Sequence, residues 1–542
     1  MYNCISVIWT SFSVLLLEPS GFAALVIFST INSLLVSGVI LWRYRRAVAR
    51  KISQQEITNG TGAGRAANYT LRASCRTDRP HFVDPTSRDL FDLALRSDRH
   101  RFIISLASVI VLSSTVTSIL FVANHFLGVE KPNLSDLTAV GIYWVFFAFL
   151  YIPLAFLSLT LRRFRFWFSY FYVVPIIAVA SFYAGAVVGG GFLTIWFLSW
   201  ALGRHGMRVT VPVLWLWCLV WTVSFPALAA FSEGATCAGM PKSITPPLFW
   251  FGFLLAGWLS WRWWGSRLVG LVVRAYDDKV LSEYELQLFA WLAVFTTLTA
   301  LGFLSFQSSL LMALMGVLPP ASFLLTYKTL TRRRQPHRPA AELLILRVFR
   351  ADRTAERLLE DIAHWWRFLG PVNMIAGPDL ANVYIAPHHL LRFMIRKLGS
   401  AFVPSSATVQ VAIAGIDRRP DPDHRYRINN LLCAPGAWEE AAFQLIENSE
   451  AILFDLRGLT HERRGALSEI DMIVAAGVGK RVLAIVDRKA DLQLLYRSPV
   501  RVPDGTNPFE VISEHEHLTG RSVFRRLVEI AASETRGAPL PK

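Results

Sequence analysis

Residues 449–458 read SEAILFDLRG and carry the clearest structural signal in the chain. The run AILF, which begins at Ala451, is uninterrupted by polar residues and ends at Asp455. A short apolar run bounded in this way is typical of a strand buried on both faces, as in a parallel sheet. A helical pattern over Arg464–Ala476 follows after a short loop. The segment therefore predicts one strand–loop–helix unit of an α/β fold.

The same alternation continues through the last 200 or so residues, which is enough chain for one domain. Short runs rich in Val, Ile and Leu alternate with helical patterns, and this indicates βα units around a mainly parallel sheet. The expected strands are Leu343–Phe349, Val372–Ala376, Arg427–Leu432, Ala451–Leu456, Arg481–Val486 and Phe509–Ile512. The expected helices are Thr354–Phe368, Pro387–Leu398, Ala437–Ile446, Arg464–Ala476 and Gly520–Ala532. We therefore predict a soluble α/β domain over residues 339–542.

The preceding residues, 1–338, have a different composition. The chain as a whole is 53% hydrophobic and 17% charged, whereas soluble proteins are about a quarter charged, and the shortage of charge lies before about Thr331. Nine apolar stretches approach the roughly 20 residues that a helix needs to cross a bilayer. They are Gly21–Trp42, Phe102–Ala123, Leu137–Leu161, Phe166–Val188, Phe192–Leu202, Val209–Phe231, Leu248–Val269, Leu286–Phe306 and Ser309–Tyr327. This pattern predicts a multi-pass transmembrane domain of about nine spans.

Basic residues gather in alternate loops between these stretches, for example over Arg43–Lys51, Arg162–Arg165 and Lys328–Arg334. The positive-inside rule then predicts an N-terminus outside the plasma (inner) membrane and a cytoplasmic C-terminal domain. The net charge of +16 is explained by these loops, so the expected partner is the lipid bilayer and no nucleic acid is expected.

One long polar loop, residues 43–101, interrupts the apolar stretches. Within it, Pro85–Asp98 predicts an amphipathic helix with Leu90, Leu93 and Ala94 on one face. That face lies either on the membrane or against the C-terminal domain. The five cysteines are scattered without CxxC or nearby histidines at metal spacing, so we expect no disulfide framework, metal site or cofactor.

Charged residues follow several of the expected strands. Ligands of open α/β sheets bind beyond the carboxyl ends of the strands, which makes these residues candidates for substrate binding. They are Arg350, Asp352, Asp379, Asp455 and Arg457.

Gly465 opens the helix that follows Asp455, and Glu469 lies near its start. The free amides of a helix N-terminus suit an anion or a sugar hydroxyl, and a glycine allows close approach of the ligand. Gly465 is therefore a further candidate for substrate binding, and Glu469 offers a carboxylate beside the same opening.

The segments Asp455–Gly458 and Gly465–Glu469 resemble the corresponding segments of nucleoside 2-deoxyribosyltransferases and of TIR domains, which have a flavodoxin-like fold. These families cleave N-glycosidic bonds, of nucleosides and of NAD respectively. The resemblance implies that Glu469 is the catalytic carboxylate, because an oxocarbenium-like centre needs a nearby carboxylate. It also implies that Asp455 contacts the ribose or the base.

The whole chain also resembles bacterial multi-pass membrane proteins with such a C-terminal domain, through Leu346–Phe349 and Gly370–Ala381. The function expected from both resemblances is membrane-anchored signalling or stress response, in which the TIR-like domain binds or cleaves NAD or a nucleoside. Arg464 and Gly465 stand where TIR domains usually have a Trp-Cys pair, so a non-catalytic scaffold for binding or self-association stays open. A channel, transporter or membrane scaffold with a regulatory domain is the other alternative.

Overall fold

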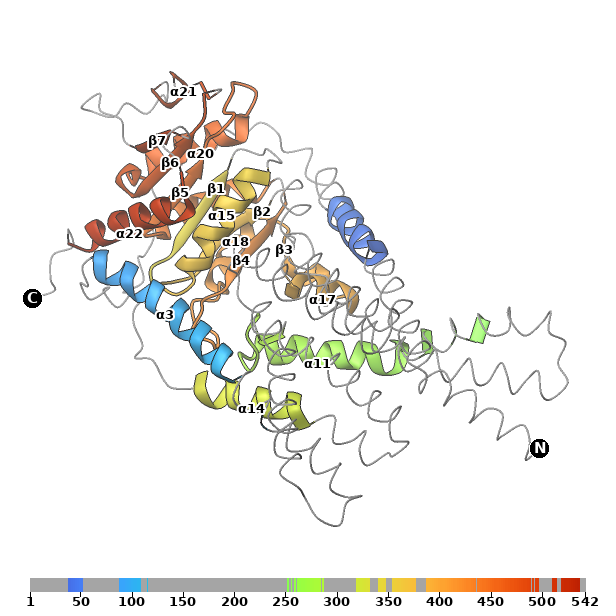
Figure 1. The fold of residues 1–542 in the computed structure, drawn as a ribbon. Coiled ribbons are helices and arrows are strands. Elements are labelled where there is room, and N and C mark those ends of the chain that lie inside the picture. The colour runs from blue at the N-terminus through green and yellow to red at the C-terminus, as the bar shows by residue number, and fades with distance from the viewer. Residues whose placement is uncertain are drawn as a thin grey trace, which may run out of the picture. The chain divides into compact units, whose positions relative to one another are not determined.

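The computed structural model divides the chain into two compact units (Figure 1). The first comprises Met1–Arg43, Arg101–Arg333 and Leu390–Ile395, and the second comprises Tyr44–His100, Arg334–His389 and Arg396–Lys542. We call the second unit the α/β unit. The residues described are 38–51, 87–108, 115, parts of 251–286, 318–331, 340–347, 353–376, 387–434, 436–488, 490–491, 493–496, 509–513 and 518–536.

A seven-stranded sheet forms the centre of the α/β unit, and every pair of neighbouring strands is parallel. The strands are β1 (Leu343–Arg347), β2 (Val372–Ala376), β3 (Phe402–Val403), β4 (Ile428–Cys433), β5 (Ala451–Asp455), β6 (Val482–Val486) and β7 (Glu510–Ser513). Their order is β3-β4-β2-β1-β5-β6-β7. The part β2-β1-β5-β6-β7 has the 2-1-3-4-5 order of a doubly wound sheet, and β3 and β4 extend it beyond β2. The predicted parallel sheet is therefore present.

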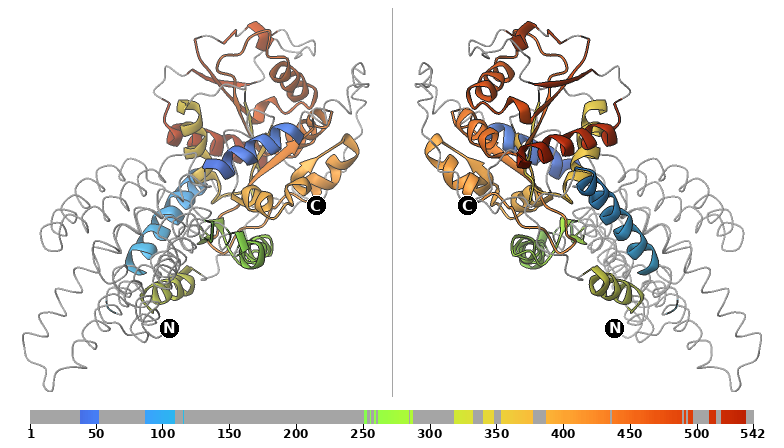
Figure 2. Two further views of the ribbon diagram at one scale, coloured as in Figure 1. Left: turned by 90° about the vertical axis from the view of Figure 1, so that its right-hand side faces the viewer. Right: turned by 90° about the vertical axis from the view of Figure 1, so that its left-hand side faces the viewer.

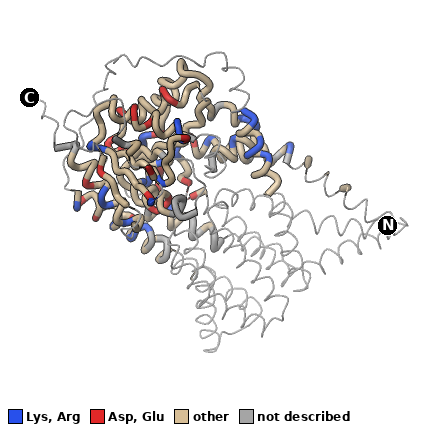
Figure 3. The backbone as a smooth tube through the Cα atoms, turned by 90° about the horizontal axis from the view of Figure 1, so that it is seen from above, with Lys and Arg blue, Asp and Glu red and all other residues tan. Residues whose placement is uncertain are grey.

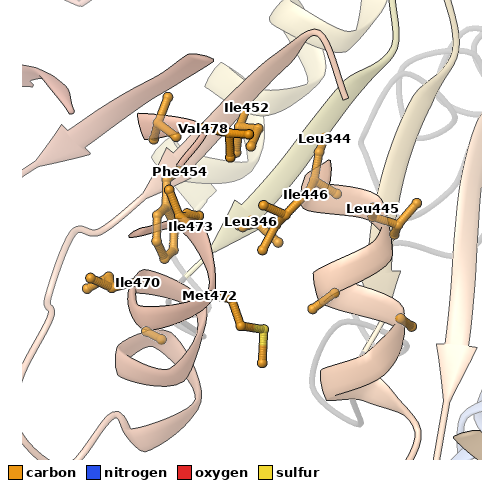
Figure 4. Packing of buried hydrophobic residues seen from close by; sticks show 14 of the residues in the cluster. Leu344, Leu346, Leu445, Ile446, Ile452, Phe454, Ile470, Met472, Ile473 and Val478 are labelled. Atoms are coloured by element: carbon orange, nitrogen blue, oxygen red, sulfur yellow. The ribbon is translucent and has the colours of Figure 1, made fainter. Parts of the chain in front are cut away.

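Helices cover both faces of the sheet (Figure 2). The helices of the α/β unit are α15 (Arg353–Trp366), α18 (Ser406–Ala414), α19 (Trp438–Asn448), α20 (Arg464–Ala475), α21 (Gln493–Tyr496) and α22 (Gly520–Arg536), with short 3-10 turns η5 (Leu398–Ala401) and η6 (Gly479–Arg481). Helix α17 (Pro387–Met394) lies mostly in the first unit, which includes Leu390–Ile395. Helices α18, α19 and α20 share one apolar core with alternate residues of the strands, such as Leu344 and Leu346 of β1. Figure 4 shows this core between the strands, α19 and α20. Helices α15 and α22 pack against each other on the opposite face.

Helix α3 (Ser87–Ala107) adds a further layer to the α/β unit through its residues up to His100. Leu90, Phe91 and Ala94 are buried. These positions fall on one side of a helix, and that side is covered by the α15/α22 layer. The amphipathic pattern of this segment is therefore satisfied within the α/β unit.

Phe91 is the centre of this contact. Its ring lies 5.5 Å from the ring of Phe524 in α22, and the guanidinium groups of Arg525 and Arg521 lie 5.0 and 5.5 Å from its centroid. Such cation–π contacts add to the burial of the ring. At the other end of the contact, the Asp98 carboxylate lies 3.1 Å from the His364 ring of α15.

The described part of the first unit contains η4 (Trp261–Gly265), α11 (Ser266–Asp277) and α14 (Leu318–Thr331). Val269 and Val273 of α11 pack with Leu286 and Leu391. Arg392 Nη2 donates a hydrogen bond to Asp277 Oδ1 at 2.8 Å, which also connects α17 to α11.

The structure corrects the expected membrane architecture. In the described part of the chain, no helix combines the length and apolar character needed to cross a bilayer. Helix α11 has 12 residues and α14 has 14, whereas a crossing needs about 20, and the longer α3 carries Asp and Arg along much of its length. The fold class is therefore a seven-stranded parallel α/β sheet, and the predicted nine-span, multi-pass transmembrane domain is not supported.

Four of the nine expected spans lie wholly outside the described residues. They are Leu137–Leu161, Phe166–Val188, Phe192–Leu202 and Val209–Phe231. The other five are described only in part.

Candidate functional site

The carboxyl ends of β1 and β5 lie side by side in the middle of the sheet. Arg347, the last residue of β1, is the register partner of Asp455, the last residue of β5. From β1 the chain proceeds to β2 on one side, whereas from β5 it proceeds to β6 on the other. Such a topological switch point is where doubly wound sheets bind their ligands. The candidate site is therefore built from the loops that leave these strands.

Asp455 is held at this edge by Arg457, two residues further along the chain. Arg457 Nε donates to Asp455 Oδ1 and Arg457 Nη2 donates to Oδ2, both at 2.8 Å. Both residues are buried, and the backbone N–H of Arg457 also donates to Oδ1 at 3.3 Å. This two-pronged pairing is the strongest geometry for arginine and carboxylate, and it fixes the first turn of the loop after β5. Acidic and basic positions both occur along the backbone in the described part of the α/β unit (Figure 3).

Gly458 and Asp487 connect the loops after β5 and β6. Gly458 has a φ of +73°, which favours glycine over residues with a Cβ. Its N–H donates to Asp487 Oδ1 at 2.9 Å. This hydrogen bond links the loop after β5 to the loop after β6 and restricts the backbone at the carboxyl edge.

Glu469 is a buried carboxyl group on α20. It lies in the second turn of the helix rather than the first, because α20 begins at Arg464. Only 7% of the residue is exposed. Burial raises the pKa of Glu469 from 4.5 to about 8, because desolvation disfavours the charged form. Burial therefore favours the neutral carboxylic acid form of Glu469, which can donate a hydrogen bond or a proton.

Gly465 and Glu469 lie one helical turn apart on the same side of α20. A Cβ added at Gly465 would lie 4.0 Å from Cη2 of Trp438, the first residue of α19. This is an ordinary van der Waals distance, so packing alone does not require a glycine here. Trp438 at the start of α19 therefore lies near Gly465 at the start of α20.

The predicted site residues thus fall into three sets. The structure joins Asp455 and Arg457 in an ion pair, and it places Gly465 and Glu469 on one side of α20. Both carboxylate oxygens of Asp455 accept hydrogen bonds from Arg457, and neither bonds to the Glu469 carboxyl group. Three predicted residues lie outside the described part of the chain: Arg350, Asp352 and Asp379. Within the part described, no group of His, Cys, Asp and Glu residues could hold a metal ion.

Trp438 was not predicted as a site residue. Its position in the sequence could have indicated it: Trp438 is the first residue of the helix after β4, and the helix that follows a strand of a parallel sheet begins at the carboxyl edge. The proximity of Trp438 to Gly465 on α20 could not be inferred from the order of the elements, because the two residues are almost 30 positions apart in the sequence.

Comparison of the chain with protein-family models, curated proteins and solved structures finds no match. The function must therefore be argued from the geometry of the carboxyl edge and from the short motifs around Asp455 and Glu469.

Proposed function

We propose that the α/β unit binds a nucleotide or nucleoside at the carboxyl edge of its sheet and cleaves the N-glycosidic bond. The observation that carries the binding proposal is the switch point, where Arg347 and Asp455 are register partners at the ends of β1 and β5. The loops there are fixed by the Asp455–Arg457 ion pair and the Gly458–Asp487 hydrogen bond. A rigid, polar edge of this kind suits recognition of ribose hydroxyls and phosphates.

Glu469 supports the second part of the proposal. A buried carboxylic acid with a raised pKa is the property that glycosidases require of a general acid. In the proposed reaction, water attacks C1′ of the ribose and the bond from C1′ to the base nitrogen breaks. In a nucleoside with a neutral base, the bond's electron pair stays on the base, which takes a proton from Glu469, and a proton of the attacking water restores the acid. The pyridinium base of NAD becomes neutral when it takes the electron pair, so it leaves without that proton and the attacking water releases its proton to solvent. Together with the resemblance to TIR domains and nucleoside 2-deoxyribosyltransferases, this chemistry suits a role in signalling or stress response.

The test uses the purified full-length chain, free in solution and clustered on a multivalent support. Binding of NAD and of nucleosides is measured by equilibrium dialysis, and release of the base is followed by chromatography. We expect binding and base release by the wild type, with release lost in Glu469→Gln and retained in Glu462→Gln. Glu462 is a matched control because it is an exposed glutamate in the loop before α20.

The outcomes separate the two parts. Binding without base release would remove the catalytic part and leave the binding part. Absence of both under free and clustered conditions would overturn the whole proposal.

A further inference from the structure

We infer that one exposed face in the first unit binds the surface of a bilayer that contains anionic lipids. It consists of the exposed side chains among the described residues of segment 251–274. They are Phe251, Leu255, Trp258, Leu259, Arg262, Trp263, Arg267, Leu271 and Arg274. We call this set the Trp–Arg face. The inference does not rest on the proposed glycosidic cleavage, because it concerns a different unit and a different ligand.

The apolar part of the Trp–Arg face is open to solvent. Phe251, Trp258 and Trp263 are 65%, 57% and 64% exposed, and Leu255 and Leu259 are exposed as well. Large apolar side chains are unfavourable in water, and a contiguous group of them marks a binding surface for a membrane or for another protein. The face therefore needs a partner that supplies an apolar environment.

These side chains lie on one side of a helix. The described positions between 251 and 259 are helical, and the four large apolar residues among them occupy positions i, i+4, i+7 and i+8 from Phe251. This spacing places all four on the same side. Arg262 lies four residues after Trp258, and its guanidinium carbon is 6.0 Å from the centroid of a Trp258 ring. A basic group is therefore part of the apolar face.

The Trp–Arg face continues into α11, which directly follows the π-helical turn η4. Arg267, Leu271 and Arg274 are exposed on α11 and are spaced by four and three residues, as on one side of a helix. Val269 and Val273 are buried in a small apolar core of the first unit. Helix α11 therefore has one covered side, and its other side is basic and open to solvent.

Electric charge identifies a lipid surface as the partner. Residues 251–276 contain three arginines, at positions 262, 267 and 274, and no Asp or Glu. Arginine stems cover apolar surface while their charged ends reach lipid headgroups, and tryptophan rings prefer the boundary between headgroups and acyl chains. A helix with such an apolar and basic surface lies in the plane of the membrane surface and is attracted by anionic lipids. The contact needs no helix that crosses the bilayer.

A second copy of the chain fits this face less well. A two-fold dimer would bring the same face of both protomers together, so the arginines of one copy would approach those of the other. Like charges that meet in an interface are unfavourable, whereas the phosphate groups of anionic lipids complement them. The lipid surface is therefore the occupant that matches both the apolar and the basic residues.

Sedimentation of the purified full-length chain with lipid vesicles tests the inference. One set of vesicles is pure phosphatidylcholine, and the other contains equal parts of phosphatidylcholine and phosphatidylglycerol. We expect the wild type to bind the anionic vesicles about tenfold more tightly than the neutral ones. High salt should reduce this difference, because it screens the attraction between arginine and phosphate.

Two variants separate the basic part of the face from the apolar part. The triple variant Arg262→Gln, Arg267→Gln and Arg274→Gln should lose the preference for anionic vesicles. The double variant Trp258→Ser and Trp263→Ser should bind both kinds of vesicle about tenfold more weakly, because binding of a surface helix scales with its buried apolar area.

The matched control is a triple variant of α3, Arg88→Gln with Arg96→Gln and Arg99→Gln, which removes three exposed arginines from another helix. It should bind vesicles like the wild type. The variant Arg262→Lys with Arg267→Lys and Arg274→Lys keeps the charge of the face and should also bind like the wild type. Melting temperatures verify the folding of each variant.

Three outcomes would overturn the inference. The first is equal binding of the wild type to neutral and anionic vesicles, and the second is unchanged binding in both the triple arginine and the double tryptophan variants. The third is an equal loss of the preference in the α3 control, which would show that net charge alone attracts the lipid. Analytical ultracentrifugation adds a direct comparison, since self-association lost in the triple arginine variant without a change in vesicle binding would identify a second copy as the occupant instead.

Discussion

Asn373 of β2 and Asn429 of β4 are register partners in the parallel sheet, and their side chains are hydrogen bonded as well, with Asn429 Nδ2 donating to Asn373 Oδ1 at 3.0 Å. The chain of polar contacts continues to Glu342, whose Oε2 accepts from Asn373 Nδ2 at 3.0 Å and whose Oε1 accepts from Arg418 Nε at 2.6 Å. Asn373 and Glu342 are buried. A buried network of this kind stabilises the fold only while every member keeps its partners.

Asn373→Ala should therefore destabilise the α/β unit by about 2–3 kcal/mol, because it leaves the amide of Asn429 and the carboxylate of Glu342 each short of a partner. Urea unfolding measures this change. The control is Asn448→Ala, which removes a half-buried amide that donates to the Gln444 carbonyl oxygen and should cost about 1 kcal/mol or less. Equal losses in the two variants would contradict the role of the network.

Gly370 should not tolerate a side chain. A Cβ at Gly370 would lie 1.8 Å from the carbonyl oxygen of Ala341, which also accepts the indole N–H of the fully buried Trp366 at 2.9 Å. Gly370→Ala should cost roughly 3 kcal/mol or more, since the backbone of Ala341 must move.

The matched control is Gly465→Ala on α20, where the new Cβ meets nothing closer than 4.0 Å. Because alanine is the better helix former, this variant should be neutral or more stable by about 0.5–1 kcal/mol. Thermal unfolding compares the two, and similar midpoints would refute the predicted difference.

The Asp455–Arg457 pair should show strong coupling. Removal of either partner takes away the buried countercharge of the other, so Asp455→Asn and Arg457→Met should each cost about 3–5 kcal/mol. The double variant Asp455→Asn with Arg457→Met should cost clearly less than the sum, because it removes both charges. A double-mutant cycle by chemical unfolding measures the coupling. Additive losses would show that the pair does not act as one unit.

Glu469 should make the stability of the α/β unit depend on pH. The folded state holds the Glu469 proton up to about pH 8, whereas the ordinary pKa of 4.5 applies after unfolding. Between these values the folded state binds the extra proton, so the free energy of unfolding falls as the pH rises and levels off above about 8. The total loss is a few kcal/mol, since each pKa unit corresponds to about 1.4 kcal/mol.

Glu469→Gln lacks this titration, so its stability relative to the wild type should increase from pH 5 to pH 9. Unfolding free energies at pH 5, 7 and 9 test this, with Glu462→Gln as the exposed control. Parallel profiles for the wild type and Glu469→Gln would show that the buried carboxyl group does not have the raised pKa.

Helix α3 should detach locally when Phe91 is removed. Phe91→Ala deletes the ring that contacts Phe524, Arg521 and Arg525, at a cost of about 3 kcal/mol. Hydrogen exchange should become faster in residues 87–100 and in α22. Arg96→Ala, an exposed position of the same helix, should leave exchange unchanged. Normal protection of α3 in Phe91→Ala would mean that other contacts hold the helix.

The strands with long apolar runs could be predicted almost to the residue, because burial on both faces leaves a strong pattern. The predicted and observed bounds of β2 agree at both ends, and those of β5 differ only at Leu456. By contrast, β3 has two residues, which is too short to leave a pattern.

Helix α18 was missed for a different reason. Its sequence SATVQVAIA is rich in β-branched residues and alternates like a strand, with Val409, Val411 and Ile413 at every second position. In the helix, Val409 and Ile413 are buried whereas Val411 is 75% exposed. Packing against the sheet and α19 therefore overrides the local preference for extended structure.

The candidate site was predictable where neighbours in the chain are neighbours in space. Asp455 and Arg457 follow one strand, so their common position could be inferred from the end of that strand. Side-chain directions and helix packing determine three further features: the Asp455–Arg457 ion pair, the burial of Glu469, and the proximity of Trp438 to Gly465. These are tertiary properties, which a single sequence does not display.

The contact between Phe91 and Phe524 has a consequence for the making of the protein. Phe524 is added about 430 residues after its partner Phe91, which at about 5–20 residues per second takes roughly 20 to 90 seconds. During this time the apolar side of α3 is exposed to solvent, because the residues that pack on it have not yet been synthesised. A nascent chain of this kind offers chaperones a defined binding segment until α22 has been synthesised.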